Sequence, residues 1–174
     1  MKENIILIGF MGSGKTTVGH IVANTLGFDF IDTDELIEKK ANMSISEIFD
    51  QLGEEEFRKM ESELLVELNN NLSHAVISTG GGLPLREENA ALLKTLGVVN
   101  YLHVTKEVVI SRLKGDTTRP LLAGDHVEEK VEKLLATRNE FYQAASHVDI
   151  DAQTGTPEEV ANRILEAFKN IFDK

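Results

Sequence analysis

Hydrophobic and polar positions follow two different periods along this 174-residue chain. Short apolar, β-branched runs are typical of buried strands, whereas apolar residues spaced three and four positions apart are typical of helices. Strands are expected at residues 5–8, 28–32, 75–79 and 98–104, with a last one beginning at 148–150. Because these strands alternate with helices, the pattern predicts a mostly parallel five-stranded sheet with helices on both faces and the first strand at its centre.

Local start and stop signals set the helix boundaries. Ser44 and Glu47 match a capping box, and Thr156, followed by Pro157 and Glu159, marks another helix start. Helices are expected at residues 15–26, from about 36 onward, and at 44–49, 53–71, 86–96, 105–113, 127–142 and 156–171. No repeat or linker interrupts this order, so residues 1–174 are interpreted as one domain.

The junction of the first strand and the first helix carries the most specific motif. Gly9 is followed, after four residues, by Gly14-Lys15-Thr16, which is the phosphate-binding P-loop pattern. Glycines let backbone N–H groups curl around phosphate oxygens, and the helix N-terminus adds partial positive charge. Lys15 would neutralise the outer phosphates, and the Thr16 hydroxyl would bind Mg²⁺. The strand before the motif and the helix after it favour this interpretation over an ordinary glycine-rich turn.

Composition excludes several classes of function. The net charge of −11, from 29 acidic and 18 basic residues, disfavours nucleic acid as a partner. The lack of cysteine excludes disulfides, thiolate metal sites and cysteine nucleophiles. No apolar run is long enough to span a bilayer, and the chain enters a strand at once, without a signal-peptide pattern. We therefore expect a cytoplasmic protein without a membrane partner.

Unusual residues follow two further strands. Asp32 and Asp34 come at the end of the second strand, and ligands bind at the carboxyl edge of open α/β sheets. A helix cap is an equally good interpretation of this pair. Three consecutive glycines, Gly80, Gly81 and Gly82, follow the third strand. They imply either a backbone with positive φ or the close approach of a ligand.

One helical pair and one loop allow more than one interpretation from the sequence. Arg58 and Glu61 are three residues apart and can pair on one helix face, where a solvated ion pair is the favoured interpretation. Residues 113–125 contain Gly, Thr, Asp and Pro, break the helical period and include Arg119. This segment is equally well interpreted as a mobile lid or as an ordinary surface loop.

Taken jointly, the motifs resemble those of the shikimate kinases along nearly the whole chain. The resemblance rests on Gly12-Ser13-Gly14-Lys15-Thr16-Thr17, Asp32-Thr33-Asp34, Phe57-Arg58 with Glu61, Gly80-Gly81-Gly82, Arg119-Pro120-Leu121-Leu122, and Arg138 with Tyr142. It implies a three-layer α/β/α P-loop kinase fold with a five-stranded parallel sheet, a substrate-binding helical segment at about 33–61 and a mobile lid at about 113–125. The implied activity is transfer of the ATP γ-phosphate to the 3-hydroxyl of shikimate, a step toward chorismate and the aromatic amino acids.

The resemblance also implies roles for individual residues. The catalytic set is Lys15, Asp34 and Arg119, with Asp34 as the candidate base at the reacting hydroxyl. ATP would be bound by Gly12, Ser13, Gly14, Lys15, Thr16, Thr17, Arg112, Arg119 and Gln153. Shikimate would be bound by Asp34, Arg58, Gly80, Gly81, Gly82 and Arg138, with the two arginines on its carboxylate and Glu61 orienting Arg58. Mg²⁺ would be held by Thr16 and Asp32, and the enzyme would be a monomer.

Three other functions share part of this pattern. A gluconate kinase would have the same P-loop and sheet, but its substrate calls for a different polar set from the arginine pair and the three glycines. A nucleoside monophosphate kinase is less consistent still. A catalytically silent nucleotide-binding module would be expected to lack Lys15, Asp34 or a substrate arginine, and all of these are present.

Overall fold

A computed structural model describes residues 1–114, 119–122 and 124–173. Its centre is a five-stranded sheet in which all strands are parallel, in the order β2-β3-β1-β4-β5. The strands are β1 (Ile5–Ile8), β2 (Asp29–Asp32), β3 (Ala75–Ser78), β4 (Val98–His103) and β5 (Val148–Asp151). β1 lies in the middle of the sheet and is completely buried. The predicted parallel sheet and the central place of its first strand are therefore confirmed.

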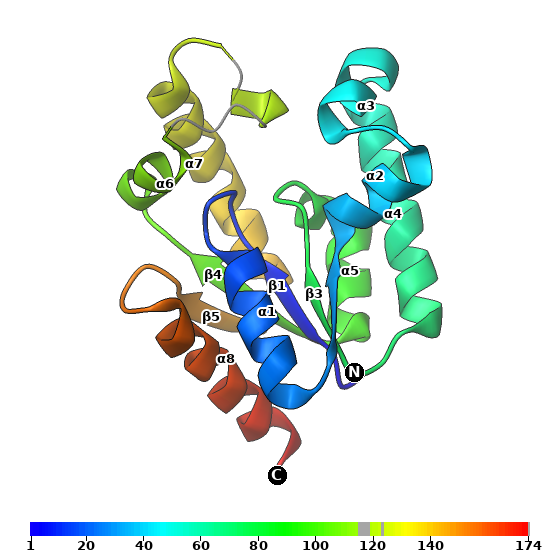
Figure 1. Cartoon of the computed structure of the whole chain (residues 1–174), viewed down its shortest axis with the longest axis vertical. Coiled ribbons are helices and arrows are strands. Elements are labelled where there is room, and N and C mark those ends of the chain that lie inside the picture. The colour runs from blue at the N-terminus through cyan, green and yellow to red at the C-terminus, as the bar shows by residue number, and fades with distance from the viewer. Residues whose placement is uncertain (115–118, 123, 174) are drawn as a thin grey trace.

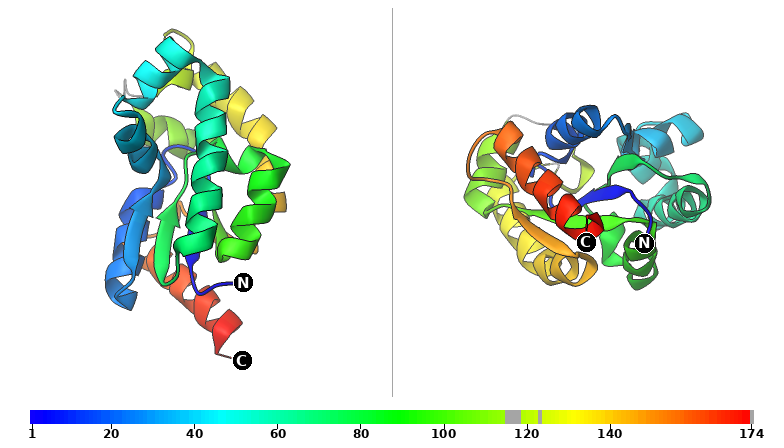
Figure 2. Two further views of the ribbon diagram at one scale, coloured as in Figure 1. Left: turned by 90° about the vertical axis from the view of Figure 1, so that its right-hand side faces the viewer. Right: turned by 90° about the horizontal axis from the view of Figure 1, so that it is seen from below.

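Helices cover both faces of the sheet. The α-helices are α1 (Lys15–Leu26), α2 (Thr33–Ala41), α3 (Ile45–Leu52), α4 (Glu54–Asn71), α5 (Glu87–Leu96), α6 (Lys106–Leu113), α7 (Val127–Ala145) and α8 (Pro157–Phe172). Two short 3-10 turns accompany them, η1 (Leu83–Leu85) and η2 (Pro120–Leu122). α1 and α8 pack together on one face, and α5 and α7 lie on the other, which gives three layers (Figures 1 and 2).

Some predicted helix boundaries were wrong, and local caps explain the differences. α2 begins at Thr33 rather than near residue 36, because Asp32 is its N-cap. α3 continues to Leu52 rather than ending at residue 49, and at its end the backbone N–H of Gly53 donates to the carbonyls of Ile48 and Phe49. α7 extends to Ala145, whose buried side chain adds one more contact with the core.

The carboxyl edge of the sheet lies between two raised groups of helices. Figure 1 shows α2, α3 and the upper part of α4 on one side of this edge, and α6, η2 and the upper part of α7 on the other. The loops that follow β1 and β3 lie between these groups. Among the residues that the structure describes, every helix falls short of the length and apolarity that a membrane span needs.

Candidate active site

The segment between β1 and α1 follows a path that favours glycine. Gly9, Gly12 and Gly14 have φ values of +149°, +80° and +90°. A Cβ on Gly9 would also lie 2.7 Å from the carbonyl oxygen of Leu102 on β4. Because α1 begins directly after Gly14, the positive end of the helix dipole faces this loop. The motif therefore has the backbone form that a phosphate-binding loop requires.

The ammonium group of Lys15 is buried within this loop. Its Nζ donates to the carbonyl oxygens of Gly9 at 2.8 Å and Phe10 at 3.1 Å, and to Oγ of Ser13 at 3.4 Å. Burial lowers the pKa of Lys15 to about 8, and the positive charge of Arg119 acts in the same direction. An anionic oxygen would be a stronger acceptor for this group than the carbonyls that hold it.

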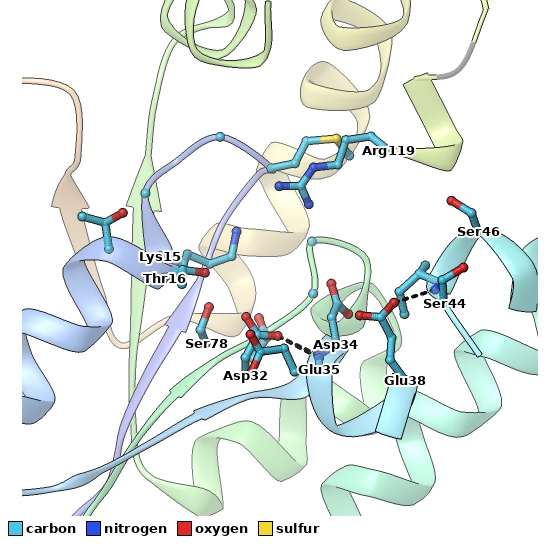
Figure 3. A pocket seen from close by; sticks show the side chains of 18 residues that line it. Lys15, Thr16, Asp32, Asp34, Glu35, Glu38, Ser44, Ser46, Ser78 and Arg119 are labelled. Carbon is cyan, nitrogen blue, oxygen red and sulfur yellow. Dashed lines mark hydrogen bonds between the residues drawn. The ribbon is translucent and has the colours of Figure 1, made fainter. Parts of the chain in front are cut away.

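A cavity of about 780 Å³ opens beside the loop at the carboxyl edge of the sheet. Figure 3 shows the cationic side chains of Lys15 and Arg119 across this cavity from the carboxylates of Asp32 and Asp34. The hydroxyl-bearing Thr16 also lines it. The cavity therefore joins two positive side chains, a helix N-terminus and two carboxylates, which suits a phosphate-bearing ligand next to a reacting group.

Asp32 and Asp34 differ in their surroundings. Oδ1 of Asp32 accepts from the backbone N–H of Asp34 at 2.9 Å and of Glu35 at 3.2 Å. Asp32 thus caps α2 and lines the cavity at the same time. Burial, together with the charge of Asp32, raises the pKa of Asp34 to about 6. Within the described residues, Oδ1 of Asp34 is buried without a hydrogen-bond partner. A buried acceptor without a partner costs free energy, which a ligand that donates to Oδ1 would remove.

A second cavity of about 90 Å³ adjoins the first. The two cavities share Met11, Asp34, Ile45, Gly80, Gly81 and Arg119. The smaller one is completed by Phe49, Phe57, Arg58, Glu61, Gly82, Pro120, Leu121 and Arg138. The lining thus combines the apolar rings of Phe49, Phe57 and Pro120 with charged side chains, which suits a compact molecule with an apolar ring and several polar substituents.

Arg58 belongs to a cluster of charged side chains that is buried on one side and exposed on the other. Its Nη1 donates to Oε1 of Glu61 at 2.7 Å, and its Nη2 donates to Oε1 of Glu54 at 3.2 Å. The Glu61 side chain is fully buried, and burial raises its pKa to about 7, although the charge of Arg58 opposes this rise. The expectation of a solvated pair was therefore wrong: Glu61 fixes the guanidinium of Arg58 from inside the protein.

Arg138 on α7 is the second arginine of this cavity, and it is buried. Only 4% of its surface is exposed, and within the described part of the chain its Nη1 has no hydrogen-bond partner. Its guanidinium carbon lies 5.8 Å from the ring centroid of Phe10. One turn later on α7, the hydroxyl of Tyr142 donates to the carbonyl of Gly81 at 2.6 Å. Tyr142 thus ties α7 to the glycine segment, and Arg138 offers an open donor to an anion.

The three glycines after β3 are explained by close approach and not by positive φ. None of Gly80, Gly81 and Gly82 has a positive φ. A Cβ on Gly80 would lie 2.6 Å from Oδ1 of Asp34, and one on Gly82 would overlap the guanidinium of Arg58. The side chains of Asp34 and Arg58 therefore occupy the space that a larger residue would need.

Arg112 and Gln153, which the resemblance assigns to ATP binding, lie in two different places. Nη1 of Arg112 donates to the carbonyl of Gly12 at 3.0 Å, and its Nη2 donates to the carbonyl of Ala152 at 3.1 Å. Arg112 therefore links the P-loop to the loop after β5. Oε1 of Gln153 accepts from the backbone N–H of Thr105 at 2.9 Å, and Gln153 lines a separate cavity beside β4 and α7. Gln153 thus faces the start of α6.

The segment predicted as a lid or a surface loop is described only in part. Residues 115–118 and 123 lie outside the described residues. Arg119 lines both cavities, and η2 follows it directly. The segment therefore brings a cation to the site under either interpretation.

Comparison with known proteins places these features in a family. The model of the shikimate kinase family matches residues 11–169. The chain belongs to the shikimate kinase family. A shikimate kinase of Thermodesulfovibrio yellowstonii is 47% identical over 169 residues, which cover 97% of this chain and 96% of that protein. One of Caldanaerobacter subterraneus is 45% identical over 166 residues, covering 95% and 96% of the two chains.

Solved structures show the same relation. The shikimate kinase of Acinetobacter baumannii in complex with shikimate has a TM-score of 0.94 and 37% identity, and the match covers 100% of this chain and 97% of that one. A gluconokinase of Sinorhizobium meliloti has a TM-score of 0.64 at 15% identity, with 99% and 94% of the two chains covered. The second likeness is one of fold alone. The similarity to shikimate kinases thus extends to sequence, whereas the similarity to gluconokinase does not.

Sequence reasoning missed several contributors to the family's site in this chain. Ile45 and Phe49 line the smaller cavity from α3, and Leu121 lines it from η2. The four-residue spacing of Ile45 and Phe49 behind the capping box was the available signal, since it places both on one helix face. The contact of Glu54 with Arg58 also went unnoticed, although it has the same helical spacing.

Proposed function

We propose that this protein transfers the γ-phosphate of ATP to the 3-hydroxyl of shikimate, giving shikimate 3-phosphate and ADP. The observation that carries the proposal is the pair of adjoining cavities, in which Asp34 lies between the P-loop and a smaller cavity lined by the two arginines Arg58 and Arg138. Membership of the shikimate kinase family supports the choice of acceptor.

In this proposal, the smaller cavity binds shikimate. The planar guanidinium groups of Arg58 and Arg138 suit the single carboxylate of the acceptor, because each can donate two parallel hydrogen bonds. The ring would lie among the apolar walls, and the backbone at residues 80–82 would face its hydroxyl groups. Glu61 would act as a positioning residue, since its Oε1 accepts from Nη1 of Arg58 and so orients that guanidinium.

The larger cavity would bind ATP, with its phosphates on the P-loop. Lys15 and Arg119 would neutralise the transferred group, and Arg112 would lie beside the base. Asp34 would accept the proton of the attacking hydroxyl, a task for which its ionised form is required. Enclosure of the reacting groups would exclude water, which competes as a phosphoryl acceptor.

The oxygen donors at this site fit Mg²⁺. Thr16 and Asp32 line the same cavity as Lys15, and hydroxyl and carboxylate oxygens are the ligands that Mg²⁺ prefers. Among the described residues there is no group of three or more acidic, His or Cys side chains that could hold a metal. This pattern matches a metal bound by one or two side chains together with substrate phosphates. Bound Mg²⁺ would neutralise charge on the phosphates.

The larger organisation follows from the same proposal. Residues 1–174 form a single domain, in which residues 33–61 bind the acceptor and residues 113–125 act as a lid that brings Arg119 to the phosphates. We also propose a monomer in the cytoplasm. The monomer is supported because one chain supplies the residues around both cavities. The location is supported because the cytoplasm contains ATP.

A coupled ADP-release assay tests the proposal, with ATP and Mg²⁺ and with shikimate, gluconate or no acceptor. We expect turnover with shikimate far above the rate without an acceptor, and none above that rate with gluconate. Turnover with gluconate alone would contradict the acceptor assignment while keeping the nucleotide site. ATP binding without turnover on either acceptor would favour the silent nucleotide-binding module.

A further inference from the structure

The guanidinium of Arg58 is already surrounded before a ligand arrives. Gly82 lies against its face, and its carbon is 5.3 Å from the ring centroid of Phe57. Glu61 accepts from Nη1 and Glu54 accepts from Nη2. An incoming carboxylate must therefore bind along an edge of the planar group.

Arg58 already donates to two carboxylates. Of the five N–H donors of its guanidinium, one on Nη1 and one on Nη2 are engaged, so a further carboxylate that makes a two-point contact would stand next to a like charge. Arg138 differs, because its Nη1 is without a hydrogen-bond partner in the described part of the molecule. An anion in the cavity thus meets one open arginine and one that is occupied.

We propose that Glu54 is a placeholder carboxylate, which occupies Arg58 in the free enzyme and is displaced by the carboxylate of the acceptor. The proposal rests on the proposed function and deepens it, because it makes Glu54 a determinant of acceptor affinity. Part of the binding energy of the acceptor is used to exchange one carboxylate on Arg58 for another.

The two carboxylates on Arg58 are not equally displaceable. The side chain of Glu61 is 0% exposed and sits beneath the guanidinium, so its removal would leave a buried charge unpaired. The side chain of Glu54 is 53% exposed and stands in the first turn of α4, from which it can swing into water. Its contact with Arg58 is 0.5 Å longer than that of Glu61, 3.2 Å against 2.7 Å. Displacement therefore falls on Glu54.

Titration of shikimate into the wild type, Glu54→Gln and Glu55→Gln by calorimetry tests this idea. Glu55 is the matched control, because it carries the same charge in the same helical turn but pairs with Arg86, and its side chain is 89% exposed. We expect Glu54→Gln to tighten the Kd for shikimate about two- to fivefold relative to Glu55→Gln, the range of an exposed ion pair. The methyl ester of shikimate, which has no carboxylate to exchange, should bind all three proteins alike.

The outcomes separate the placeholder from other roles. A weaker Kd in Glu54→Gln would overturn the proposal and make Glu54 a group that positions Arg58 for binding. Equal Kd values in the two variants would overturn it as well, because the loss of one negative charge in this turn of α4 would then explain any change in Kd. Absence of shikimate binding to all three folded proteins, checked by thermal unfolding, would contradict the proposed function and the placeholder with it.

Discussion

Two glycine-rich segments follow neighbouring strands of the sheet and use glycine for different reasons. In residues 9–14, after β1, the three glycines have φ values between +80° and +149°. In residues 80–82, after β3, no glycine has a positive φ, and the space beside the backbone is taken by Asp34 and Arg58. In the first segment glycine permits an unusual backbone conformation, whereas in the second it leaves room for side chains.

This difference extends to the two cavities. The half proposed to bind phosphate is centred on one continuous stretch of chain, the P-loop, whose form is encoded locally, although Asp32, Asp34 and Arg119 complete its cavity. The acceptor half is assembled by side chains from α2, α3, α4 and α7 around the end of β3. Substitutions in one half should therefore weaken one ligand and spare the other, and a group that lines both cavities should affect the reaction more than either binding step.

The largest effect is expected for Asp34, which lines both cavities. Asp34→Asn keeps the shape of the side chain but cannot take the hydroxyl proton, so kcat should fall about 10²–10⁴-fold. The Kd for ATP, measured by calorimetry, should stay nearly unchanged. The neighbouring variant Glu35→Gln controls for the loss of one charge at this cavity. Wild-type turnover in Asp34→Asn would remove this residue from the chemistry.

The two glycine segments can be compared directly by two alanine variants. Gly82→Ala places a methyl group into the guanidinium of Arg58 and should weaken the Kd for shikimate about tenfold or more. Gly14→Ala forces an alanine to φ +90° and should weaken the Kd for ATP by a similar factor. Each variant should bind the other ligand normally. Loss of both ligands in either variant would contradict the separation of the two halves.

The pH dependence of kcat/KM should carry the signature of Asp34. Because burial raises the pKa of Asp34 from 3.8 to about 6, the ionised form is lost as the pH falls through 6. Activity should then decrease about tenfold for each further pH unit. The residual activity of Asp34→Asn should lack the part of this limb that belongs to Asp34 and keep only what protonation of Glu61, whose pKa is raised to about 7, contributes through Arg58. A flat profile down to pH 5 in the wild type would be incompatible with Asp34 as the base.

The smallest effect is expected at the edge of the nucleotide cavity. Arg112→Ala removes two hydrogen bonds, to the carbonyls of Gly12 and Ala152, and leaves the reacting groups in place. The Kd for ATP should weaken about two- to tenfold, and the Kd for shikimate should not change. An effect on shikimate as large as that on ATP would mean that Arg112 supports the whole P-loop region.

The nucleotide half could be predicted from the sequence to a greater extent than the acceptor half. The hydrophobic period of each strand and helix and the P-loop motif are local signals. The parallel sheet with β1 at its centre could therefore be predicted from the sequence. The start of α2 was predicted three residues late, since a capping Asp32 and a ligand-binding Asp32 have the same sequence signature. In the structure, Asp32 both caps α2 and lines the larger cavity.

The parts that could not be predicted depend on distant contacts. Residues 80–82 allowed two explanations until Asp34 and Arg58 were seen against them. Glu61 looked like a surface partner of Arg58, because helical spacing alone does not reveal that its side chain is buried. Gln153 shows the reverse case, since the family resemblance implied a contact with ATP, whereas its side chain accepts from the backbone N–H of Thr105.

The most direct test of the account is to identify where the phosphate goes. Phosphorus NMR of a reaction with ATP, Mg²⁺ and shikimate should show ADP together with an equal amount of one phosphate monoester, coupled to the ring proton at the 3-position of shikimate. That result would identify the 3-hydroxyl of shikimate as the phosphoryl acceptor. Formation of ADP with inorganic phosphate alone would contradict the account, because water would then be the acceptor.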